Sequence, residues 1–306
     1  MKINKTLFAH LAILLTNVTF GLNFSFAKNL MPHYMSGITL ALTRVVAGMA
    51  LVGGLTLIFK RQRVEKRDFF KLFLIGAVGL GVTQALFMEG LSRTSPVDAA
   101  IITTFVPILV VVISVLFYAE KFTLPKVIGL VLGTTGALLV IIKSGGTADS
   151  SGDMFFGNIL MVCCTVTYSL YYIWLTPLMR KYNPLVVLSW IFTFGSLFLV
   201  PFAGRELIHT DFSSFNATAT TSLLFVIFCS TFIGYSSMAY SLTRLSPTTA
   251  SIYSYCKPVV AMIAAVYTGQ DKITVTSIIA ILLVFAGVIF ITRVKSLTFS
   301  KNSLNK

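Results

Sequence analysis

Long apolar stretches, separated by short breaks, run along the whole chain. Each stretch has roughly 18 to 25 residues, the length that an α-helix needs to cross about 30 Å of hydrocarbon. Most breaks contain Pro, Gly or clustered charge, as at residues 60–63 (KRQR) and 143–146 (KSGG). The pattern predicts ten membrane-spanning helices, at residues 7–29, 35–59, 69–91, 95–118, 124–143, 154–176, 184–202, 217–243, 247–268 and 274–293.

The composition agrees with a membrane protein. Of the 306 residues, 56% are hydrophobic and 11% are charged, and the mean hydropathy is +0.88. Soluble domains carry about 25% charged residues, so an aqueous fold could not bury this much apolar surface. The first apolar stretch is too long for a signal-peptide core and has no convincing small-residue cleavage site, so we keep it as helix 1. We expect an all-α integral membrane protein.

The two halves of the chain resemble each other at an offset of 151 residues. Residues 91–100 return as residues 242–251 with five of ten positions identical, and the same shift places Pro107 on Pro258. We therefore expect two repeats, at residues 1–146 and 147–306, that together form one transmembrane domain. Because each half has an odd number of helices, five, the halves would be inverted relative to each other, as in transporters that work by alternating access.

The basic residues predict the orientation of the chain. With both termini in the cytoplasm, seventeen of the 24 Lys and Arg residues lie on the cytoplasmic side and five on the other, whereas Arg44 and Lys257 lie inside predicted helices. This distribution follows the positive-inside rule. The net charge of +14 then reflects contact with lipid headgroups. We expect no nucleic-acid partner, because no basic patch is interleaved with aromatic residues.

Several motifs resemble the EamA-type family of the drug/metabolite transporter superfamily, over essentially the whole chain. They are residues 20–24 (FGLNF), followed by Lys28 in helix 1, Arg44 in helix 2, and Pro107 with residues 119–121 (AEK) at the end of helix 4. That family typically has Trp-Gly followed by Asn-Phe in helix 1, and helices 4 and 9 that each contain a Pro and end near a Glu.

This sequence departs from the family pattern at three positions. Phe20 replaces the Trp, Asp271 replaces the second Glu, and Lys257 precedes Pro258 where an acidic or neutral residue is commoner. The resemblance implies a multi-pass permease of a bacterial inner membrane, commonly an exporter of amino acids, related metabolites or toxic compounds. Relatives in the superfamily import or exchange phosphorylated compounds or nucleotide-linked sugars, so this alternative stays open.

Lys257 is the main candidate for solute binding. It lies near the middle of its predicted helix, about 15 Å from the end at 1.5 Å per residue, and ionisable residues at that depth are expensive and commonly functional. Tyr253 and Ser254 lie on the same helix face, and Pro258 should bend the helix there. This group could hold an anionic or zwitterionic solute. Alternatively, Lys257 pairs with a carbonyl or carboxylate and only stabilises the bundle.

Two other buried charges are candidates for different roles. Arg44 suits either bidentate carboxylate binding or a structural tie to backbone carbonyls. Glu89, within the third predicted helix, is the candidate for proton coupling, unless it is solvated or paired with Arg93. The prolines of the two repeats, Pro107 and Pro258, are hinge candidates.

Further side chains could line a central cavity or only pack the bundle. Gly76 and Gly79 should allow close helix approach. The predicted helices 124–143 and 274–293 have few polar residues and are expected to be scaffold and candidates for a homodimer face. The cavity candidates are Asn17, Phe20, Phe24, Gln84, Tyr168 and Tyr235.

No motif indicates catalysis, a metal site or a cofactor. The four Cys lie in predicted helices without metal-ligand spacing, and we expect them to be free thiols. The sequence has no phosphate-binding loop, so transport would be driven by gradients. The function that fits best is a secondary transporter of a small solute; the rivals are a passive channel and a membrane-embedded enzyme.

Overall fold

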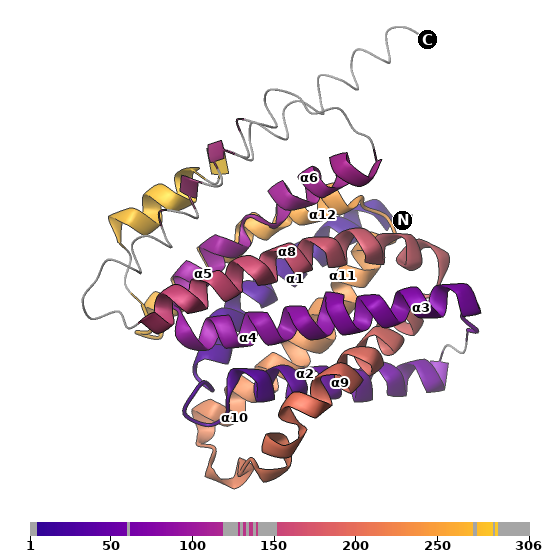
Figure 1. Ribbon diagram of the computed structural model, residues 1–306, viewed down its shortest axis with the longest axis horizontal. Coiled ribbons are helices and arrows are strands. Elements are labelled where there is room, and N and C mark those ends of the chain that lie inside the picture. The colour runs from indigo at the N-terminus through magenta and orange to yellow at the C-terminus, as the bar shows by residue number, and fades with distance from the viewer. Residues whose placement is uncertain are drawn as a thin grey trace, which may run out of the picture.

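The described part of the chain consists of helices joined by turns and short irregular segments (Figure 1). The computed structural model describes residues 5–59, 62–118, 152–271 and 274–283, and positions 128, 131, 132, 135, 136, 139, 285 and 286. Within this part, eight helical stretches are long and apolar enough to cross a membrane. Most of the predicted helix 124–143 lies outside the described residues, as do residues 284 and 287–293 of the predicted helix 274–293, Glu120 and residue 272.

The helical elements follow one another with short connections. The first half comprises α1 (Lys5–Lys28), α2 (Gly37–Phe59), α3 (Lys66–Leu74), η1 (Ile75–Val82), α4 (Thr83–Arg93), α5 (Pro96–Thr103) and α6 (Val106–Tyr118). The second half comprises α8 (Gly152–Lys181), α9 (Pro184–His209), η2 (Phe212–Ser214), α10 (Ala217–Leu224), η3 (Phe225–Gly234), α11 (Tyr235–Leu242), α12 (Pro247–Ile252), η4 (Tyr253–Tyr255) and α13 (Cys256–Tyr267).

Two predicted helices are interrupted just before their prolines. A turn at residues 104–105 separates α5 from α6, and the 3₁₀ turn η4 separates α12 from α13. Proline has no N–H to donate, and its ring clashes with the carbonyl four residues earlier, which lies at Thr103 for Pro107 and at Ser254 for Pro258. The two prolines therefore explain the positions of both breaks. Our prediction of continuous helices at 95–118 and 247–268 was wrong at these positions.

Two further irregularities were not predicted from the sequence. The segments η1 and η3 are π-helical, and a shift of 151 residues places η1 almost on η3. A π-helical turn accommodates an extra residue, and such turns are frequent at functional sites. Both segments lead directly into helices, α4 and α11, that reach the centre of the bundle.

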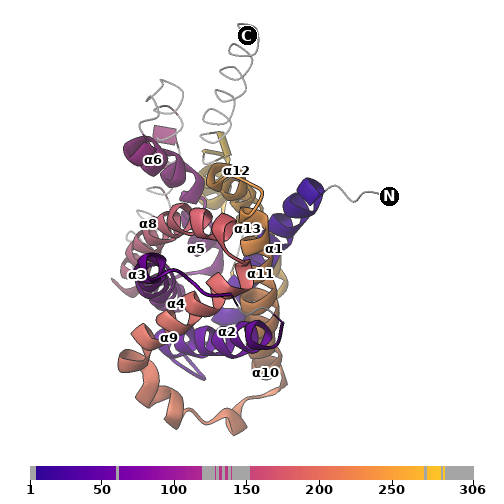
Figure 2. The same ribbon diagram turned by 90° about the vertical axis from the view of Figure 1, so that its right-hand side faces the viewer.

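The helices surround a common centre (Figure 2). The largest contacts join α2 to α9, α4 to α8, η1 to α9, and α1 to α13 and α11, so each half packs mainly on the other. Glycine permits the closest approach between η1 and α9, because a Cβ on Gly76 would lie 2.8 Å from the carbonyl oxygen of Ile191. This confirms the close approach expected at Gly76.

Candidate functional site

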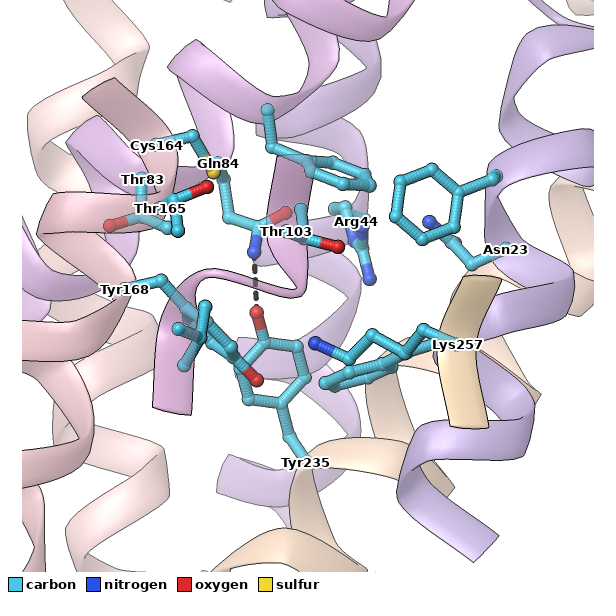
Figure 3. Close-up of a pocket in the computed structure, with 14 residues that line it drawn as sticks. Asn23, Arg44, Thr83, Gln84, Thr103, Cys164, Thr165, Tyr168, Tyr235 and Lys257 are labelled. Atoms are coloured by element: carbon cyan, nitrogen blue, oxygen red, sulfur yellow. Dashed lines mark hydrogen bonds between the residues drawn. The ribbon is translucent and has the colours of Figure 1, made fainter. Parts of the chain in front are cut away.

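A small cavity lined by both aromatic and polar side chains lies at the centre of the bundle (Figure 3). It has a volume of about 50 Å³ and is lined by residues of α1, α2, α4, α5, α6, α8, α11 and α13. Pockets that hold small organic ligands measure roughly 300–1,000 Å³, so the cavity is smaller than such a pocket. The cavity contains seven of the predicted solute-binding residues: Phe20, Phe24, Arg44, Gln84, Tyr168, Tyr235 and Lys257.

Lys257 points into this cavity from the start of α13. Its side chain is 4% exposed, and its Nζ lies 4.9 Å from the ring centroid of Tyr168 and 5.7 Å from that of Phe20. A close contact fixes its backbone, since a Cβ on Gly21 would lie 3.1 Å from the carbonyl oxygen of Lys257. Ring faces attract a cation but do not neutralise its charge. No salt bridge to a described carboxylate accompanies these contacts.

Arg44 is the second cation of the cavity. It is 2% exposed, and its Nε donates to Thr231 Oγ1 at 3.0 Å while Nη2 donates to Ser230 Oγ at 2.9 Å. Both acceptors are neutral hydroxyls on η3, whereas we predicted either a solute carboxylate or backbone carbonyls as partners. A guanidinium has five N–H donors, so these two bonds occupy only part of its capacity. The π-helical segment thus holds Arg44 in position.

A hydrogen bond between the two halves crosses the cavity. The amide nitrogen of Gln84 donates to the hydroxyl of Tyr235 (Figure 3), and these residues are separated by 151 positions, the repeat offset. The ring of Tyr235 also packs against Phe20, with centroids 5.3 Å apart. The contact therefore joins both halves at the cavity.

The cavity includes side chains that we did not predict. Asn23 belongs to the motif at residues 20–24, and Phe87 lies one helical turn from Gln84, so helical spacing could have identified both. Val106 corresponds to Lys257 at the 151-residue offset, which could have identified it too. The remaining four, for which we find no such signal, are Thr83, Thr103, Cys164 and Thr165.

Three predicted solute-binding residues lie outside the cavity lining. Asn17 donates from Nδ2 to its own helix, to the carbonyl of Ile13 at 2.7 Å, and Tyr253 bonds through its hydroxyl to His10 Nδ1 at 2.8 Å. Ser254 is buried away from the cavity. The prediction assumed one continuous α-helix, but Tyr253 and Ser254 belong to the 3₁₀ turn η4, where side chains advance by a larger angle per residue.

Glu89 has structural partners at one end of the bundle. Its Oε1 accepts the backbone N–H of Ile38 at 2.8 Å, and Oε2 forms a salt bridge with Arg93. A carboxylate at this position satisfies an N–H group at the start of α2 that has no partner within the helix. Glu89 lies outside the cavity lining, and its proton-coupling role stays a prediction.

Lys28 and Asp68 are also satisfied by protein groups. Lys28 Nζ donates to the carbonyls of Leu91, Ser92 and Thr94 at 2.8–3.0 Å. Asp68 accepts from Lys181 Nζ at 2.6 Å. In the described part of the chain, no group of three or more His, Cys, Asp or Glu residues could hold a metal ion.

A multi-pass helical membrane protein with a central cavity built by both halves is the architecture of a transporter. The chain belongs to the EamA-like transporter family, which it matches at residues 7–142 and 155–293, and it is thus of the drug/metabolite transporter type.

Two curated relatives and one solved structure extend this result. The chain is 26% identical to an uncharacterized transporter of Archaeoglobus fulgidus, over 92% of this chain and 98% of the relative. It is 25% identical to a probable terminal-alkyne amino-acid exporter of Streptantibioticus cattleyicolor, over 96% and 95%. A crystal structure at 19% identity covers 95% of this chain and 96% of its own, with a TM-score of 0.64, and supports the fold.

Proposed function

We propose that the protein is a secondary transporter that exports small metabolites, such as amino acids or drug-like compounds, across a bacterial inner membrane by alternating access. The observation that carries the proposal is the central cavity, in which Arg44 and Gln84 from the first half meet Tyr235 and Lys257 from the second. A site shared by two halves can open to either side when the halves move against each other.

The division into two inverted repeats, at residues 1–146 and 147–306, is part of this proposal. It is supported by the Gln84–Tyr235 contact at the repeat offset and by the matching π-helical segments. The breaks before Pro107 and Pro258 give each half an interrupted helix beside the cavity, which supports their role as hinges. The distribution of Lys and Arg supports termini on the cytoplasmic side.

The direction and the solute class draw on a relative. The protein of Streptantibioticus cattleyicolor is named as a probable amino-acid exporter, and it matches nearly the whole of this chain. A cavity with two cations and aromatic walls suits a carboxylate-bearing solute.

Counterflow of radiolabelled amino acids in proteoliposomes tests the proposal. We expect saturable exchange that unlabelled solute competes, a strong loss in Lys257→Ala, and none in Lys66→Ala, whose side chain is exposed at the start of α3. An imposed pH gradient, applied to the wild type and to Glu89→Gln, tests proton coupling through Glu89. Folded protein without exchange of any small metabolite, or with non-saturable flux, would refute the carrier mechanism.

The direction of transport needs a separate measurement. We expect cells that overproduce the wild type to accumulate less of a fed amino acid than cells that produce Lys257→Ala, because export lowers the internal concentration. Greater accumulation in the wild-type cells would favour the alternative, an importer or exchanger.

A further inference from the structure

The charge of the central cavity defines its solute more closely than its size does. Arg44 and Lys257 both line the cavity, and the fourteen lining residues include neither Asp nor Glu. The partners of the two cations are neutral: hydroxyls for Arg44, and the rings of Tyr168 and Phe20 for Lys257. Two positive charges thus face one small space whose described lining has no carboxylate.

Two carboxylates outside the cavity lining have basic partners of their own. Glu89 binds Arg93, and Asp68 binds Lys181 and Lys71, at positions outside the cavity lining. A charge in a low-dielectric interior is costly unless it is paired, and two like charges in one cavity raise this cost. An anionic solute would supply the missing counter-charge.

Two amide groups indicate a second feature of the solute. The oxygens of Asn23 and Gln84 are buried without a hydrogen-bond partner, and both residues line the cavity. A buried acceptor without a partner is costly, and a solute with a hydroxyl or N–H group would satisfy it. The rings of Phe20, Phe24 and Phe87 form an apolar wall beside these amides.

We propose that the transported solute is a small organic acid with a net negative charge, whose carboxylate binds between Arg44 and Lys257 and whose neutral hydrogen-bond donor faces Asn23 and Gln84. The inference rests on the proposed transport function and narrows its solute class. A zwitterionic amino acid brings its own ammonium group, which would add a third cation to a cavity whose described lining has no carboxylate. The cavity therefore favours α-hydroxy acids over α-amino acids of the same skeleton.

Matched solutes test this inference without any substitution. Lactate and alanine share one skeleton, and 3-phenyllactate and phenylalanine share a larger one; each pair differs in whether a hydroxyl or an ammonium is next to the carboxylate. Dissociation constants are measured by calorimetry on the purified full-length protein in nanodiscs, with phenethylamine as the cationic analogue. We expect the hydroxy acid to bind at least about tenfold more tightly than the amino acid within each pair, and phenethylamine not to compete.

Variants at Lys257 test the assignment to this cavity. We expect Lys257→Met, which keeps an unbranched apolar stem, to reduce the preference for the hydroxy acid to less than twofold, and Lys257→Arg to retain most of it. The exposed Lys66→Met serves as the control and should leave the preference unchanged. Equal or tighter binding of the amino acids to the wild type would overturn the inference, as would an undiminished preference in Lys257→Met.

The two proposals can fail separately. Saturable counterflow of phenylalanine without a preference for phenyllactate would keep the carrier and refute the net-anion inference. Tight binding of the hydroxy acids, with no counterflow of any solute in the series, would support the anion site and refute the transport function for these solutes.

Discussion

Lys28 is half-buried and Lys257 is buried, and their ammonium groups have opposite surroundings. Lys28 Nζ donates to the carbonyls of Leu91, Ser92 and Thr94, at 3.0, 2.9 and 2.8 Å. An ammonium has three donors, so Lys28 is fully satisfied by the protein. Lys257 Nζ lies over two aromatic rings and faces a cavity. Lys28 therefore stabilises the fold, whereas we propose that Lys257 retains donors for a solute.

The same contrast holds between the ends of the bundle and its centre. At the ends, Glu89 and Asp68 each join a basic side chain and a further donor, which are Ile38 N–H and the Tyr182 hydroxyl. At the centre, Arg44 and Lys257 have neutral partners. Burial alone therefore does not distinguish a structural charge from a functional one, but the identity of its partners does.

Removing the charge of Lys257 should have the largest effect on transport. We expect Lys257→Met to lower solute exchange by about 100-fold, since a charge-assisted contact contributes roughly 1.5–3 kcal/mol. The midpoint of thermal unfolding should not fall, because the substitution removes a charge that has no carboxylate partner. Counterflow and thermal unfolding of the same preparation measure both quantities. Exchange at the wild-type rate would show that Lys257, like Lys28, does not bind the solute.

The corresponding change at Lys28 should lower the stability of the protein and leave solute binding nearly unchanged. We expect Lys28→Met to destabilise the protein by about 2–3 kcal/mol, because three carbonyls lose their donor. Solute affinity, measured by calorimetry on the folded fraction, should stay within about twofold of wild type. A large loss of affinity at unchanged stability would show that Lys28 takes part in solute binding. The exposed Lys66→Met is the matched control for both lysines.

The hydrogen bond between Gln84 and Tyr235 should have an intermediate effect. We expect Tyr235→Phe to lower exchange by about fivefold to tenfold, because it removes a contact worth about 1 kcal/mol that joins the two halves at the cavity. Gln84→Leu should act through the same bond. Their combined effect should then be smaller than the product of the single effects, as a double-mutant cycle would show. Independent effects would place the two residues in separate roles.

Tyr253→Phe should have the smallest effect on transport. Its hydroxyl bonds to His10 and lies outside the cavity lining, so we expect solute exchange within about twofold of wild type. The lost bond should lower stability by about 1 kcal/mol. A tenfold loss of exchange would show that Tyr253 contributes to solute binding, as we predicted from the sequence.

Most of the fold and part of the site follow from the sequence. Hydropathy placed the eight spans that the structure describes, because hydrocarbon thickness fixes helix length. Lys257 and Arg44 could be predicted as cavity residues because charged side chains are rare in membrane-spanning segments. Tyr253 and Ser254 were misplaced because the position of a 3₁₀ turn depends on how Pro258 is accommodated. The hydroxyl partners of Arg44 could not be predicted, since they require the π-helical turn of η3.

Cys164 offers the most direct test of a central site that opens to both sides, because it lines the cavity while the other three Cys do not. A variant with Cys163→Ala, Cys229→Ala and Cys256→Ala is treated with a membrane-impermeant anionic methanethiosulfonate, in right-side-out and in inverted vesicles. We predict labelling of Cys164 from both sides, slowed by the transported solute. Labelling from one side only, in a variant that still exchanges solute, would contradict alternating access to this cavity.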